Sequence, residues 1–297
     1  MKISVLGSGT SHGIPVVGCP CPVCTSADSR DKRMRSSLFI EGSSREAALI
    51  DAGPEFRLQA VRAGITRLDA IFLTHSHADH IHGLDDVRPL SRDNPIPVYG
   101  NEETITEMEE RFSYIWKETQ KGGGKPKLKP IVTDREIRLG SLTFTPIPVK
   151  HGALDIYGWE IRENYTHENS PPENTGKSLI YLTDTSAVPP ASLKQLARNQ
   201  NFRQYRIIII GGLRTRPHAT HFTFEEALKT ALSIGAEEIY LTHICHEHSH
   251  AEIEEICQKF DESRPNRTWQ MENRQISTRR KEEVKIHPAW DGLELVI

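Results

Sequence analysis

The sequence lacks both a membrane-spanning run and a strong charge of either sign. No apolar stretch approaches the ~20 residues that a helix needs to cross a bilayer. The first residues, MKISVLGSGT, lack the long apolar core of a secretory signal peptide. The chain has 37 basic and 40 acidic residues, a net charge of −3, so nothing draws it generally to nucleic acid or to an anionic membrane. These absences favour a cytoplasmic protein with no membrane partner and disfavour a nucleic-acid partner.

Cysteine is also scarce, and its odd number disfavours a disulfide framework. Three of the five cysteines, Cys19, Cys21 and Cys24, lie close together in GCPCPVC. In a reducing compartment such a cluster more often binds metal. Three thiolates at these spacings suit a tetrahedral structural zinc and leave one position for a ligand from elsewhere. Cys245 and His246 are the two candidates for that position.

The apolar pattern predicts strands and helices within one domain. The chain has 297 residues, 37% hydrophobic and 26% charged, which is typical of a globular protein, and no linker or repeat divides it. Helical spacing predicts helices at 54–64, 103–120, 223–236 and 251–260. Apolar or alternating runs predict strands at 2–6, 68–75, 96–100, 136–150, 156–162, 178–186, 206–212 and 290–297. We interpret 10–37 as an ordered loop, 121–130 as a flexible basic loop and 163–176 as a polar insertion. Ligand-type residues recur at strand ends, which favours two sheets with helices outside them.

The stretch LTHSHADHIHG, at 73–83, carries the densest set of metal-ligand residues. His75 and His77 are two residues apart at an extended strand end, so their side chains point to the same side. Asp79 and His80 follow after a turn. Imidazole and carboxylate suit zinc, manganese or iron. Two ligand pairs from one loop can serve two ions about 3.5–4 Å apart, which can clamp the attacking and leaving oxygens of a phosphate or acyl substrate.

The pattern H-x-H-x-D-H after an apolar strand resembles the signature of the metallo-β-lactamase superfamily. The other motifs of that family are also present in order, namely Asp51 in LIDAG, His151 in PVKHG, Asp184 in YLTDTS and His243 in YLTHI. The resemblance runs along the whole chain. It implies an α/β fold, a four-layer αββα sandwich, in a single domain over 1–297.

The resemblance also implies a ligand set and a nucleophile. One metal would be held by His75, His77 and His151, the other by Asp79, His80 and His243, and Asp184 would bridge them. Two dications lower the pKa of a bridging water, so hydroxide forms near neutral pH without a serine or cysteine nucleophile. Asp51 would either orient a ligand histidine from outside the coordination shell or cap a turn.

Within the superfamily, the three-cysteine element is similar to the PhnP-like branch of phosphoribosyl 1,2-cyclic phosphate phosphodiesterases. In that branch the fourth zinc ligand lies three residues after the last catalytic histidine, which makes it His246 here. The segment HFTFEEAL matches the branch's active-site histidine to His221, a general acid or a stabiliser of phosphoryl charge, acting beside Asp79. The resemblance favours manganese, with zinc as the alternative, at the catalytic pair, and zinc at the cysteines. Insertions near 114–130 and 163–176 depart from the branch.

Four further residues are candidate substrate contacts. Arg214 and Arg216 carry guanidinium groups that suit bidentate phosphate contact, with a solvated loop as the alternative. His218 either serves in place of His221 or, as we expect, caps the following helix or stays at the surface. His12 lies in a glycine turn that the superfamily places near the metals.

The sequence therefore predicts a dinuclear-metal phosphodiesterase that acts on a small cyclic or nucleotide-like phosphodiester. One alternative is a tRNA 3′-processing endoribonuclease, which needs a basic surface that the charge balance does not provide. The other is a PqqB-like protein of cofactor biosynthesis, in which the metal site is altered. A homodimer is compatible with the sequence, which does not decide the oligomeric state.

Overall fold

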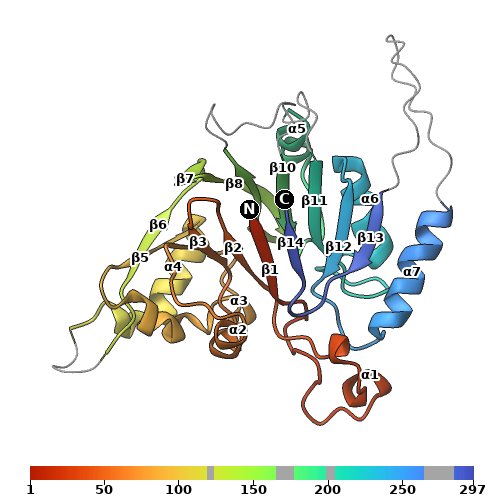
Figure 1. Ribbon diagram of the computed structural model, residues 1–297, viewed down its shortest axis with the longest axis horizontal. Coiled ribbons are helices and arrows are strands. Elements are labelled where there is room, and N and C mark those ends of the chain that lie inside the picture. The colour runs from red at the N-terminus through yellow and green to blue at the C-terminus, as the bar shows by residue number, and fades with distance from the viewer. Residues whose placement is uncertain (119–123, 165–176, 199–204, 264–283) are drawn as a thin grey trace.

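Two sheets pack face to face, with helices on both outer sides (Figure 1). The structure is a computed structural model that describes residues 1–118, 124–164, 177–198, 205–263 and 284–297. Each sheet has seven strands, in the orders β14-β1-β2-β3-β4-β5-β6 and β13-β12-β11-β10-β9-β8-β7. The first sheet is antiparallel from β14 to β3 and parallel from β3 to β6. The second is antiparallel from β7 to β10 and parallel from β10 to β13.

The strands of the two sheets come from both halves of the chain. The first sheet contains β1 (Lys2–Gly7), β2 (Ser37–Glu41), β3 (Ala47–Ile50), β4 (Ala70–Phe72), β5 (Ile96–Gly100), β6 (Leu128–Val132) and β14 (Glu294–Val296). The second contains β7 (Ile137–Leu139), β8 (Leu142–His151), β9 (Leu154–Glu163), β10 (Lys177–Leu182), β11 (Tyr205–Gly211), β12 (Glu238–Thr242) and β13 (Lys285–Pro288).

The helices divide between the two outer faces. Those beside the first sheet are α2 (Phe56–Arg62), α3 (Ala78–Ile81), α4 (Glu102–Arg111) and the 3₁₀ helices η2 (Leu84–Ser91) and η3 (Ser113–Ile115). Those beside the second are α5 (Pro190–Arg198), α6 (Phe224–Ile234) and α7 (His250–Ser263). The loop after β1 carries α1 (Pro22–Thr25) and η1 (Ser29–Asp31). No helix in the described part of the chain combines the length and apolar character that a membrane crossing needs.

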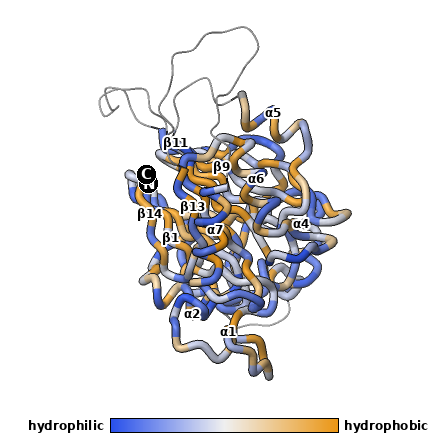
Figure 2. The backbone as a smooth tube through the Cα atoms, turned by 90° about the vertical axis from the view of Figure 1, so that its right-hand side faces the viewer, coloured by the Kyte–Doolittle hydropathy of each residue, from blue (hydrophilic) through white to orange (hydrophobic). Residues whose placement is uncertain are grey.

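The run of isoleucines in β11 shows how the layers form. Successive side chains of a strand point to opposite faces. Ile207 and Ile209 pack into the core between the sheets, whereas Ile208 and Ile210 pack against the outer helices. Both faces are covered, so the strand is apolar throughout. Figure 2 shows hydrophobic residues gathered along the central strands of the second sheet. The expected four-layer αββα sandwich is confirmed.

Two local predictions were wrong. The helix expected over 103–120 ends at Arg111, because Phe112 leaves the helical conformation and buries its ring in the core beside the first sheet. The basic loop expected at 121–130 contains the start of β6, an edge strand paired with β5. Lys129 and Pro130 concealed it, since charge and proline are features of exposed edges. Most of the predicted insertion at 163–176 lies outside the described residues.

Aromatic rings join the two sheets beneath the end of β4. The rings of Phe72 in β4 and Phe144 in β8 stack with centroids 3.8 Å apart. The Trp159 indole in β9 donates a hydrogen bond to the Leu73 carbonyl at 3.2 Å, and the Tyr157 N–H donates to the Thr74 carbonyl at 3.0 Å. The second sheet therefore fixes the backbone of the first sheet where the histidine-rich stretch begins.

Phe144→Ala should lower the free energy of unfolding by about 3–5 kcal/mol, because it leaves a cavity between the sheets. Denaturant unfolding measures the change. Leu58 is 53% exposed, so Leu58→Ala is the control and should change the free energy of unfolding by less than about 0.5 kcal/mol. Equal losses in the two variants would contradict this description of the core.

Candidate metal centre

The candidate ligands meet at the ends of strands from both sheets. His75 and His77 follow β4, and Asp79 and His80 lie in α3, which begins directly afterwards. The other three come from the second sheet: His151 ends β8, Asp184 follows β10 and His243 follows β12. Carboxyl ends of parallel strands are the usual place for a site in an open sheet.

The seven expected ligands fall into two groups, each with all its ligand atoms within 4.8 Å of one another, and a third group of this kind joins His221 to His151 and Asp184. The first group is His75, His77 and His151, and the second is Asp79, His80, Asp184 and His243. Within the first, His75 Nε2 lies 2.9 Å from His77 Nδ1. The structure thus brings together all seven residues that the sequence proposed for the catalytic ions.

The geometry of the second group fits a cation. His80 Nε2 lies 3.2 Å from an Asp79 oxygen and 3.1 Å from an Asp184 oxygen, and His243 Nε2 lies 3.0 Å from Asp184. The Nε2 atoms of His80 and His243 are both buried without a hydrogen-bond partner. Side-chain atoms that converge without bonding to one another are arranged as ligands around a shared ion.

The electrostatics of the group point the same way. Burial opposes charge on His80, yet the carboxylates of Asp79, Asp184 and Asp51 raise its pKa well above the usual value. Burial likewise opposes charge on His243, but Asp184 and Asp79 raise its pKa to about 9. The carboxylates therefore attract positive charge to this point, which a divalent ion would supply.

Hydrogen bonds from outside the groups orient the ligand rings. The Asp51 carboxylate accepts bonds from the Thr74 N–H and hydroxyl, both at 2.8 Å, and from His80 Nδ1 at 2.7 Å. His151 Nδ1 donates to the Thr220 carbonyl at 2.8 Å. In both histidines Nε2 is left to face the site, as a metal ligand requires. Of the two roles expected for Asp51, its geometry fits the orienting one.

Three of the residues in this region have left-handed backbone conformations. The φ angles of Asp51, Asp184 and His243 are 60°, 52° and 56°. Among the described residues, only Arg45 is a further non-glycine residue of this kind. Such conformations are unfavourable for side chains with a Cβ and concentrate at functional sites.

His221 stands on the rim of the two groups. Its Nδ1 lies 3.7 Å from an Asp184 oxygen, and its ring centroid lies 4.7 Å from that of His151 and 4.9 Å from that of His243. Burial, with the neighbouring His243, lowers the pKa of His221 to about 3. The His218 ring is exposed and lies 5.0 Å from His221.

The other candidate substrate contacts lie farther out. Arg214 and Arg216 both bind Glu247, with their nearest nitrogens 2.9 and 2.5 Å from a carboxylate oxygen. His12 is exposed in the turn after β1, and among the described residues its side chain makes no hydrogen bond or ion pair with the ligands. Gly9, three residues before His12, pairs with Ile244, so the chain entering this turn runs beside the end of β12.

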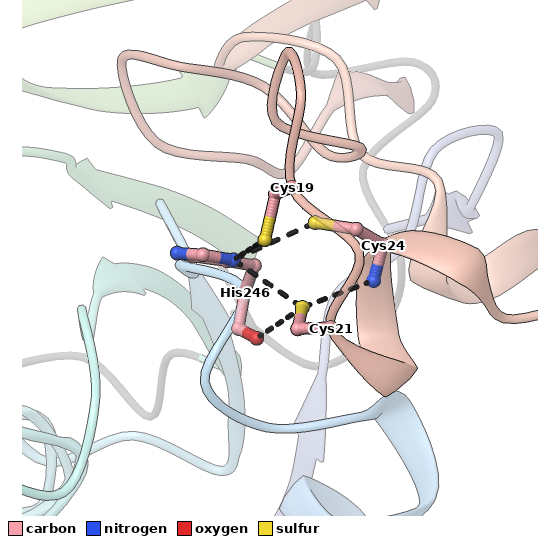
Figure 3. A group of neighbouring side chains, drawn as sticks. All are labelled: Cys19, Cys21, Cys24 and His246. Carbon is pink, nitrogen blue, oxygen red and sulfur yellow. Dashed lines mark hydrogen bonds between the residues drawn. The ribbon is translucent and has the colours of Figure 1, made fainter.

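A separate cluster unites the cysteine loop with the segment after His243. His246 Nδ1 lies 3.4 Å from the sulfurs of Cys19 and Cys21 and 3.5 Å from that of Cys24 (Figure 3). A backbone hydrogen bond from Cys24 lowers the pKa of the Cys21 thiol to about 6. Three sulfurs and one nitrogen around a point match a tetrahedral zinc site. Of the two fourth ligands left open by the residue spacing, the structure brings in His246; Cys245 is buried outside the group.

Sequence reasoning missed Thr74, which connects Asp51 to the histidine stretch. A repeated pattern could have revealed it, because Leu-Thr precedes a ligand at 73–75, 182–184 and 241–243. It also missed the contact of Ser76 with Glu107 and Arg111 in α4, which no sequence motif marks.

Comparisons with known proteins bear on the family and the fold of the chain. A family model described as a beta-lactamase superfamily domain matches residues 47–244. An octanoyltransferase of Porphyromonas gingivalis is 34% identical to this chain in an alignment of 299 positions. The alignment covers 100% of this chain and 52% of that protein, so the chain spans about half the length of this relative.

Two solved structures are similar over the whole chain. The crystal structure of a new diphosphatase from the PhnP family is 34% identical, with a TM-score of 0.75, and the match covers 100% of this chain and 97% of that one. Zn²⁺-bound PqqB from Methylobacterium extorquens is 17% identical, with a TM-score of 0.71 and full coverage of both chains. At that identity the second likeness shows the fold alone.

Cys21→Ala should remove one zinc per chain, because three ligands remain where four converge. Metal analysis of the purified protein measures the stoichiometry. Cys257→Ala, at a buried helical cysteine outside the cluster, is the matched control and should keep the zinc. A Cys21→Ala protein with unchanged zinc would show that the cysteine cluster is not a zinc site.

Proposed function

The chain belongs to the beta-lactamase superfamily of metal-dependent hydrolases and resembles its PhnP family, and from this we propose that it hydrolyses a small cyclic or nucleotide-like phosphodiester with two divalent ions. The observation that carries the proposal is the convergence of seven ligand-type side chains in two adjacent groups, with His221 beside them. The likeness to a PhnP-family diphosphatase favours a second candidate substrate, a diphosphate-linked compound, in which the bond cleaved would be a P–O–P anhydride and not an ester.

The two groups divide the ligands between two ions, manganese or zinc. His75, His77 and His151 would hold the first, and Asp79, His80 and His243 the second, with Asp184 shared. Bound divalent ions supply Lewis acidity and activate water at neutral pH. Asp51 keeps the His80 ring in the required orientation, and the Thr220 carbonyl does so for His151.

His221 would act on the phosphoryl group. Its lowered pKa makes the imidazole neutral at pH 7, so one ring nitrogen carries a hydrogen and can donate a hydrogen bond to a phosphoryl oxygen. This favours stabilisation of phosphoryl charge over general acid catalysis, the two roles expected of it. Asp79 contributes as a ligand at the same centre.

The rim beyond His221 would receive the rest of the substrate. Arg214 and Arg216 share the single carboxylate of Glu247, which leaves a net positive charge there. Guanidinium groups suit a terminal phosphate. His218 and His12 would contact the substrate from neighbouring turns.

The proposal also covers the domain organisation, the structural zinc, the location and the oligomeric state. A single domain over 1–297 includes a structural zinc bound by Cys19, Cys21, Cys24 and His246. Its thiols must stay reduced, which favours a cytoplasmic location. The homodimer stays a prediction. Nearly half of the octanoyltransferase lies outside the match, so its transferase activity is not carried over to this chain.

The alternatives find less support. An endoribonuclease would need an excess of positive charge, and the net charge is −3. A PqqB-like role with an altered metal site does not fit seven ligand-type residues that all converge.

Phosphorus NMR tests the substrate class. The metal-loaded protein is incubated with 5-phosphoribosyl 1,2-cyclic phosphate, a 2′,3′-cyclic nucleotide or ADP-ribose, and the metal is removed by a chelator before measurement. We expect ring opening of at least one cyclic probe, abolished by Asp79→Ala; cleavage of ADP-ribose alone would identify a diphosphatase instead. Intact probes, with two catalytic ions present by metal analysis, would refute the phosphodiester proposal.

His221→Ala should retain both catalytic ions and lower kcat by about 10²–10⁴-fold, because the substitution removes a contact to the phosphoryl group but no metal ligand. Kinetics with the cleaved probe and metal analysis provide the two readouts. His287→Ala, on the edge strand β13, is the matched control and should keep full activity. Loss of an ion in His221→Ala would instead identify His221 as a ligand.

A further inference from the structure

We propose that Glu107 and Arg111 of α4 are positioning residues that fix Ser76. By fixing Ser76 they set the distance between the neighbouring side chains of His75 and His77. This inference rests on the proposed role of those two histidines as ligands. It concerns neither the ligands themselves nor the substrate, but a support on the outer side of the centre.

The three residues form a closed set of contacts. The Ser76 hydroxyl donates to a Glu107 carboxylate oxygen at 2.5 Å, and Arg111 donates to the Ser76 carbonyl. Arg111 also binds the same Glu107 oxygen at 2.6 Å. Ser76 is thus held by its side chain and by its backbone at once, and it is the single residue between the two histidines.

The contact differs from the ordinary ion pairs on the other helices. Glu225 and Lys229 in α6 form the same i,i+4 pair at 2.5 Å, but both side chains are about two-thirds exposed, and neither makes a hydrogen bond or ion pair to another described residue. Glu107 and Arg111 are 37% and 39% exposed, and Ser76 itself is only 8% exposed. The α4 pair therefore reaches a buried peptide, whereas the α6 pair does not.

The other contacts of this loop hold the residues on either side of Ser76. On the inner side, β9 and Asp51 fix residues 73 and 74 through hydrogen bonds. His80 is held by Asp51, and His151 by the Thr220 carbonyl. The His77 side chain is only partly buried, and among the described residues its ring hydrogen-bonds only to His75, whereas its backbone carbonyl accepts from the N–H groups of His80 and Ile81. The Ser76 contacts are accordingly the restraint on the peptide between His75 and His77.

The consequence is a ligand pair organised before metal binds. Residues that orient metal ligands from outside the coordination shell typically change affinity 10- to 100-fold when they are removed. The first group, which contains His75 and His77, should be affected more than the second, which Asp51 supports.

The test uses the full chain with its cysteine site loaded with zinc and the catalytic sites emptied. Mn²⁺ is added, and electron paramagnetic resonance of the free ion reports binding. Glu107→Ala and Arg111→Ala should weaken one of two Mn²⁺ sites by about 10- to 100-fold and leave the other within about threefold. Glu107→Gln, which keeps a hydrogen-bond acceptor, should restore most of the affinity. Glu225→Ala and Lys229→Ala are the matched controls and should bind both ions like the original protein.

A double substitution separates a local from a general effect. Ser76→Ala combined with Glu107→Ala should weaken binding no more than the stronger single change, because both remove the same hydrogen bond. Unchanged Mn²⁺ affinity in Glu107→Ala and Arg111→Ala, additive effects in the double variant, or equal losses in the α6 controls would each overturn the proposal. An original protein that binds fewer than two Mn²⁺ ions would overturn the dinuclear centre itself, and the support with it.

Discussion

The Asp51 carboxylate is the contact on which the arrangement of the site depends. It is fully buried and accepts hydrogen bonds from Thr74 and His80, which lie on either side of His75 and His77. A buried carboxylate is costly unless its oxygens are bonded, so the loop is drawn into one conformation around it. The strand order then brings β8, β10 and β12 to the same end of the sandwich, where their terminal residues complete the two groups.

One short segment contributes a residue to the cysteine cluster and another to the candidate metal centre. His243 and His246 are separated by two residues, and each belongs to a different cluster of ligand-type side chains. The buried Arg33 of the cysteine loop also donates to the carbonyls of Cys245 and His248. The cysteine loop thus holds the chain just beyond His243 from both sides, and the position of that histidine depends on a loop distant in sequence.

Those parts of the molecule with a strong local pattern could be predicted from the sequence. The isoleucines of β11 and the capping box of α6, in which Thr223 and Glu226 bond each other's backbone, identify their elements without further information. The sequence does not predict the strand β6, because an exposed edge tolerates Lys129 and Pro130. It predicts too long a helix at 103–120, because the tertiary packing of Phe112 ends the helix early. The contacts of Ser76 with α4 join residues about thirty positions apart, and only the folded chain brings them together.

The left-handed conformations of Asp51, Asp184 and His243 have an evolutionary consequence. Each one costs folding free energy that glycine would not incur at the same φ angle, and the surrounding structure must offset it. The region that carries the chemistry is therefore also one where the chain is strained. At Asp51 the hydrogen bonds from Thr74 and His80 offset this cost, whereas at Asp184 and His243 selection for thermal stability alone would favour glycine and would erase the site while leaving the sandwich intact.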